Sequence, residues 1–124
     1  MVSVDWWIED LVRGALEAVL SEDRIVVIQG NCGVACKLYK KLCDSAKSKD
    51  IKHNEKDDKY ELMENQDYDN LFKFFKDRRF KNPKNLIVCM DYKNTFGEAT
   101  NRPHIRESFY IINLDGIIKS DGKD

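Results

Sequence analysis

The sequence has no hydrophobic run long enough to cross a membrane. A transmembrane helix needs about 20 consecutive, mostly apolar residues, and the apolar stretches of this 124-residue chain are much shorter. The N-terminus, MVSVDWWIEDLV, carries acidic residues where a secretory signal carries a basic flank. We therefore expect a soluble, cytoplasmic protein without a membrane partner.

An excess of charge of one sign is also missing. The 21 lysines and arginines are balanced by 22 aspartates and glutamates, which leaves a formal net charge of −1. Nucleic-acid binding requires a concentrated excess of basic residues, so we expect no nucleic-acid partner. A hydrophobic content of 42% and a charged content of 35% are typical of a globular chain, and the length fits one domain.

Histidine is scarce, and the cysteines do not form two close pairs. The chain has two histidines and four cysteines, whereas structural zinc sites usually show two close pairs of ligands. We expect no metal site and no tightly bound cofactor. In a reducing compartment cysteines are mostly buried apolar residues or redox-active thiols. Cys43 and Cys89 lie in apolar segments and are predicted to be buried, which leaves Cys32 and Cys36 for chemistry.

Hydrophobic periodicity predicts alternating helices and strands. The unbroken β-branched run at 25–28 is typical of a strand in the middle of a sheet. The turn after residue 91 leaves room for one more strand. The predicted helices are 4–20, 34–46, 67–78 and a last one from Pro103 to about 113–116, and the predicted strands are 25–28, 59–63 and 86–90.

The two tryptophans and the two histidines do not point to a functional site. At least one of Trp6 and Trp7 is predicted to pack in the core, whereas His53 lies in a charged loop and is predicted to be solvated. His104 follows Pro103 without another residue that would make it a catalytic base.

The turn from Cys32 to Cys36 is the strongest chemical signal. Cys32 lies at or just before the start of a predicted helix, where the helix dipole and unpaired amides stabilise a thiolate. Cys36 follows one turn later, roughly 6 Å along the axis, which is near the upper limit of disulfide reach. An attacking thiol and a resolving thiol are the minimum for thiol–disulfide exchange.

Several segments together resemble glutaredoxins over residues 22–119. RIVVIQGNCGVACKLYKKL resembles the strand, cysteine turn and lysine-rich helix of that family, and KYELMENQDYDNLFKFF resembles the strand, acidic turn and helix that follow. FKNPKNLIVCMDYKNTFGEA is similar to the segment with the family's cis-proline, next strand and glycine turn, and SFYIINLDGIIK to its last helix. The resemblance implies one glutaredoxin-like domain over 1–119, including helix 4–20, and a polar tail at 120–124.

The fold and function follow from that resemblance as expectations. The fold would be α/β, a thioredoxin-like three-layer sandwich with a mixed central sheet of about four strands flanked by helices. The protein would be a monomer or weak dimer that acts as a thiol–disulfide oxidoreductase on a small thiol or a protein disulfide, with glutathione as a candidate co-substrate. Cys32 and Cys36 would be catalytic, and the substrate-binding residues would be Asn31, Gly33, Asn82, Pro83 and Gly97.

The sequence also departs from the family. The spacing is CxxxC instead of CxxC or CxxS, so in a gap-free alignment of the helix Gly33 takes the place of the nucleophile. The family's glutathione-contacting lysine before the motif is absent. These departures favour, as the main alternative, a noncatalytic thioredoxin-fold binding or adaptor module.

Two further alternatives have weaker support. VVIQGNCGVACK has the strand, glycine turn and helix of a phosphate-binding loop, with LIVCMD as a metal-holding strand that ends in Asp91. The full motif is not met, because Ala35 and Cys36 stand where glycine and lysine are required. This degenerate nucleotide-binding loop ranks below the redox interpretation. A papain-like cysteine hydrolase, suggested by QGNCG and a distant His104, ranks last.

Overall fold

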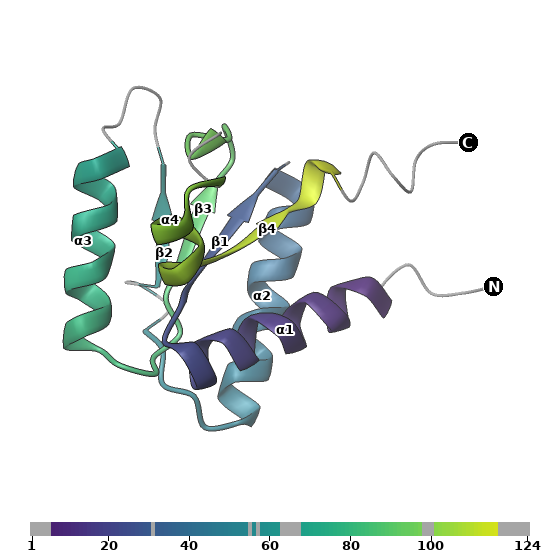
Figure 1. The fold of residues 1–124 in the computed structure, drawn as a ribbon. Helices are drawn as coiled ribbons and strands as arrows, with labels where there is room; N and C mark the ends of the chain where they lie inside the picture. Colours follow the sequence, from purple (N-terminus) through teal and green to yellow (C-terminus); the bar gives the residue numbers. More distant parts are fainter. Residues whose placement is uncertain are drawn as a thin grey trace.

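The computed structural model describes residues 6–30, 32–54, 56, 58–62, 68–97 and 101–116. Figure 1 shows the order of helices and strands along the chain. Within the described residues, no helix is both long and apolar enough to span a membrane. The elements are α1 (Trp6–Glu22), β1 (Ile25–Gln29), α2 (Cys32–Ser48), β2 (Lys59–Glu61), α3 (Tyr68–Lys81), β3 (Val88–Asp91), α4 (Pro103–Ser108) and β4 (Phe109–Asn113).

The four strands form one sheet in the order β2-β3-β1-β4, and every pairing is parallel. Strand β1 lies between β3 and β4 with all five residues buried, so the prediction of a central strand is confirmed. The expected mixed sheet is wrong. A helix follows each of the first three strands and returns the chain to the same edge, which makes each next strand parallel.

The sheet separates two hydrophobic clusters that alternate residues of β1 divide between them. Val26 and Ile28 pack with residues of α1 and α2, whereas Ile25 and Val27 pack with residues of α3 and α4. Figure 1 accordingly shows α3 on one side of the sheet and α1 and α2 on the other. Helices therefore cover both faces, as expected for an α/β domain. Trp7 packs against the first cluster, as predicted for one of the two tryptophans.

The C-terminal part differs from the sequence prediction. Instead of a helix from Pro103 to about 113–116, α4 ends at Ser108 and the chain continues as strand β4. Phe109 already has an extended backbone, with φ −125° and ψ 139°. Its segment, FYIIN, pairs with β1 from Ile25 opposite Phe109 to Gln29 opposite Asn113. The aromatic and β-branched residues of this run favour a strand once an open sheet edge is beside them.

The topology defines where the sheet presents a crevice. Helix α2, which follows β1, and helix α4, which follows β3, lie on opposite faces of the sheet. In open parallel sheets, ligands bind outside the carboxyl ends of two neighbouring strands whose connections diverge in this way. The carboxyl ends of β1 and β3, where Gln29 lies opposite Asp91, are therefore the expected place for a site.

Candidate functional site at the carboxyl ends of β1 and β3

Asp91, the last residue of β3, is fully buried, and its carboxylate is held by neighbouring donors. Gln29 donates from Nε2 to Asp91 Oδ2 at 3.0 Å and to Asn94 Oδ1 at 2.9 Å. The backbone amides of Thr95 and Phe96 donate to Asp91 Oδ1 at 2.6 Å and Oδ2 at 3.1 Å. Both carboxylate oxygens therefore hold the loop after β3 in place, and the Gln29 side chain bridges the crevice.

Gly30 continues β1 in a conformation that only glycine adopts easily. Its φ is +138°, and a Cβ at this position would lie 2.8 Å from Leu114 Cβ and 3.4 Å from the backbone nitrogen of Asp115. The missing side chain lets the segment after β4 pack directly against the end of β1. The tight turn predicted between β1 and the next helix is thus also a close backbone contact with the far end of the chain.

The predicted cysteine pair lies partly within the described structure. Helix α2 begins at Cys32, so this residue stands at a helix start as predicted, but its side chain and Asn31 lie outside the described residues. Cys36 is half-buried, and its Sγ lies 3.5 Å from Tyr92 Oη in the loop after β3. Gly33 is exposed in the first turn of α2. These residues share the edge at which Asp91 lies.

The structure does not bring Asn82 and Pro83 to this edge. Both precede β3, and because β1 and β3 are parallel, the start of β3 lies at the edge opposite the end of β1. The described residues contain no cis peptide bond, in contrast to the cis-proline expected at Pro83. Asn82 instead donates its side-chain amide to Arg78 O at 3.1 Å. Gly97, with φ +43°, lies in the loop that Asp91 holds.

The other two cysteines are buried, as predicted. Cys43 and Cys89 are 6% and 0% exposed, and both belong to the hydrophobic clusters. Burial, and to a lesser extent the charge of Asp91, raises the pKa of the Cys89 thiol far above its ordinary value. Cys89 therefore stays protonated and unreactive.

No known family model matches this chain. Comparison with curated proteins and with solved structures gave no significant match either. The resemblance to glutaredoxins consequently stays a prediction, and the function has to be argued from the geometry of this chain.

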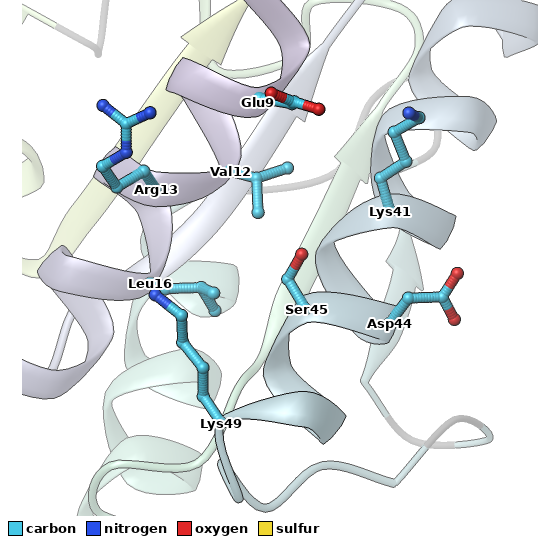
Figure 2. Close-up of a pocket in the computed structure, with 8 residues that line it drawn as sticks. All are labelled: Glu9, Val12, Arg13, Leu16, Lys41, Asp44, Ser45 and Lys49. Carbon is cyan, nitrogen blue, oxygen red and sulfur yellow. The ribbon is translucent and has the colours of Figure 1, made fainter.

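A groove lies between α1 and α2. It has a volume of about 450 Å³. Figure 2 shows Val12, Leu16 and Ser45 between the two helices, with Lys49 extending from the end of α2 towards α1. Val12 and Leu16 are almost completely buried at its floor, and polar residues form its rims. The charged lining residues are Glu9, Arg13, Lys41, Asp44 and Lys49.

A buried pair of polar side chains lies in a region that the sequence prediction treated as a solvated loop. His53 Nδ1 is 3.2 Å from Asp58 Oδ2, and the two side chains are only 9% and 3% exposed, so the prediction of a solvated His53 is wrong. Burial raises the pKa of Asp58 to about 6. A backbone hydrogen bond with Asn54, the electrostatic influence of His53 and Arg78, and a side-chain hydrogen bond with His53 oppose the rise. The stretch around the pair has no helical or strand period, so no sequence pattern pointed to it.

Proposed function

We propose that the chain is a noncatalytic binding module with an α/β sheet of the parallel kind that nucleotide-binding domains use. The hydrogen bonds of Asp91 carry this proposal. In an enzyme of this architecture, the polar groups at the carboxyl ends of β1 and β3 would face a substrate. Here Gln29, Asp91 and Asn94 bind one another instead.

The phosphate-loop alternative agrees with the strand–turn–helix arrangement of this chain, but the residues that nucleotide hydrolysis requires are missing. Nucleotide hydrolysis in such loops requires a lysine on the phosphates, a hydroxyl on the magnesium ion and an available carboxylate on the neighbouring strand. Ala35 and Cys36 take the glycine and lysine positions, and helix α2 already begins at Cys32, so Ala35 is buried inside a helix instead of lining a loop. This favours a domain without nucleotide turnover.

Thiol–disulfide exchange is the second candidate, and one contact favours it. Tyr92 Oη lies 3.5 Å from Cys36 Sγ, and a hydrogen bond from a phenol to sulfur would stabilise a thiolate. Cys32 stands one turn before it at the helix start. The candidate ranks second because Asn82 and Pro83, which would pair with an extended substrate in a thioredoxin-like fold, lie at the other edge of the sheet.

The groove between α1 and α2 is the surface that we assign to the partner. Val12 and Leu16 at its floor are only 6% and 2% exposed, so a partner would contact mainly the rims, which carry three basic residues and two acidic ones. A peptide segment with acidic residues facing Lys41 and Lys49 would match these rims. The partner is therefore a protein segment of that chemistry.

The first test measures catalysis by the purified full chain. We expect background rates for magnesium-dependent hydrolysis of ATP and GTP, because Asp91 is already bound by Gln29, Thr95 and Phe96. We also expect a background rate for reduction of a small mixed disulfide with glutathione.

Two outcomes would contradict the noncatalytic proposal. Disulfide reduction that is lost in Cys32→Ser or Cys36→Ser and kept in Cys43→Ser would establish the second candidate. Nucleotide hydrolysis that is lost in Asp91→Asn would establish a working phosphate loop. Circular dichroism of each variant separates lost activity from lost folding.

The second test examines the groove. Peptides selected by display against the folded chain should be acidic. Lys41→Glu should weaken their binding at least about tenfold, because reversing a charge places like charges together. Lys40→Glu is the matched control, since Lys40 is exposed on the same helix but does not line the groove. Equal affinities for the Lys41→Glu variant and the unaltered chain would assign the peptides to another surface.

A further inference from the structure

The two edge strands of the sheet differ in their protection against pairing with another strand. Figure 1 shows β2 and β4 at the two borders of the sheet, and among the described residues each pairs with one neighbour. Strand β2 has three residues, KYE, and its Lys59 Nζ lies 3.6 Å from Glu61 Oε1. Short, charged edge strands resist pairing with another chain. Strand β4 is longer, and its segment FYIIN has neither a charge nor a proline. It therefore lacks this protection.

The outer side of β4 is accessible. A second groove, of about 480 Å³, is lined in part by the first three residues of this strand, Phe109, Tyr110 and Ile111. Tyr110 and Ile111 are half-buried and lie on opposite faces of the sheet, because Tyr110 packs against the cluster of α1 and α2 and Ile111 against the other cluster. A strand added beside β4 would cover both side chains.

Helix α1 adds apolar surface beside Tyr110. The residues of α1 that line the groove with α2 share one side of the helix: Glu9, Val12, Arg13 and Leu16. At about 100° per residue, Trp7 and Leu11 lie on the opposite side, and both are half-buried. Gly14 shares that side, and a Cβ there would lie only 2.5 Å from Tyr110 Oη. We call the partly exposed apolar residues Trp7, Leu11, Tyr110 and Ile111 the β4 surface.

The residues of β4 are compatible with those of a second copy. In an antiparallel pairing centred on Ile111, this residue would face Ile111 of the second copy, and Tyr110 would face Ile112 of the second copy. Cross-strand pairs of aromatic and β-branched residues stabilise a sheet, whereas like charges directly opposite each other destabilise it. A charged residue near the centre would face its own copy, and FYIIN contains none. The segment thus meets a condition that only self-pairing imposes.

We propose that two copies of the chain pair through antiparallel β4 strands and form one continuous sheet with the four strands of each copy. The two-fold axis places both α1 helices on the same face, so Trp7 and Leu11 border the contact in each copy. The assembly stops at the dimer, because the remaining edge strand, β2, is short and charged. The contact is smaller than a standard interface of about 20–30 residues a side, so the association is weak and reversible. This inference goes beyond the proposed function and leaves the groove between α1 and α2 open.

Sedimentation velocity of the full chain, from about 10 μM to about 1 mM, tests the proposal. We expect a reversible monomer–dimer equilibrium without larger species. Ile111→Lys should weaken dimerisation at least about tenfold, because two lysines would face each other at the two-fold axis. Leu11→Lys should also weaken it. Leu20→Lys is the matched control, since Leu20 is 44% exposed on the same helix but outside the β4 surface, and it should leave the dimer unchanged.

Hydrogen exchange of the unaltered chain locates the contact even if Ile111→Lys does not fold. Amides of residues 109–113 should exchange more slowly at high than at low protein concentration. A chain that stays monomeric at 1 mM would overturn the proposal. Concentration-independent exchange at 109–113, or undiminished dimerisation of a folded Ile111→Lys, would place the contact on another surface and would also overturn it. Equal effects of Leu11→Lys and Leu20→Lys would do the same.

Discussion

Gly30 fixes how closely the segment after β4 approaches the end of β1. Its φ is positive, and a Cβ added to it would lie only 2.8 Å from Leu114 Cβ, so any larger residue requires rearrangement. The neighbouring Gln29 bridges to Asp91 and Asn94. Two consecutive residues thus join β1 to the loop after β3 and to the end of β4, and this is why the carboxyl edge is a structural junction.

Replacement of Gly30 tests this junction. Gly30→Ala should lower the free energy of unfolding by about 3 kcal/mol or more, because backbone strain and overpacking each cost about 1–3 kcal/mol. Chemical denaturation measures the change. Gly116→Ala is the control, because its nearest contact, at 3.8 Å from Asn113 Cγ, is an ordinary one, and the expected change is within about 0.5 kcal/mol. Similar losses in both variants would contradict the close packing at Gly30.

At the scale of elements, long periodic segments could be predicted and short ones could not. The amphipathic stripe of α1 and the buried run of β1 follow directly from the spacing of apolar residues, because burial on one stripe or on both faces requires those patterns. Strand β4 was predicted as helix. Its five residues are too few to separate a helical period from a strand, and α4 before it begins with a proline that suits a helix start.

In the loop before β2, the burial of polar groups could not be predicted from the sequence either. Ile51 and Asp58 are buried in a segment whose composition is typical of a solvated loop. Burial of a carboxyl group there depends on His53 beside it and on Arg78 from α3, which is distant in sequence. Such a contact between distant segments produces no local sequence pattern, so it could only be found in three dimensions.

At the scale of the whole molecule, the buried carboxyl of Asp58 links stability to pH. Its pKa in the folded chain is about 6, above the ordinary 3.8, so the folded state binds this proton more tightly than the unfolded state does. The contribution of this group to stability is therefore fully present below about pH 4 and is lost as the pH rises through about 6. The charged, desolvated carboxylate is the destabilising form.

This linkage gives a measurable prediction. The contribution of Asp58 to the free energy of unfolding should fall by on the order of 1–3 kcal/mol between pH 5 and pH 8. Asp58→Asn should remove this part of the dependence, whereas Asp10→Asn, at an exposed position, should keep it. Urea denaturation at several pH values provides the comparison. An Asp58→Asn variant with the same pH dependence as the unaltered chain would show that another group is responsible.

The sequence by itself determined that the chain is an α/β domain with amphipathic helices, a central buried strand, and buried Cys43 and Cys89, because these properties depend on the local spacing and type of residues. The tertiary structure decided the all-parallel strand order, the conversion of 109–113 into a strand, the separation of Pro83 from the cysteine turn, and the pairing of His53 with Asp58. These features depend on which segments meet across the sheet, and contacts between distant segments leave no period in the sequence.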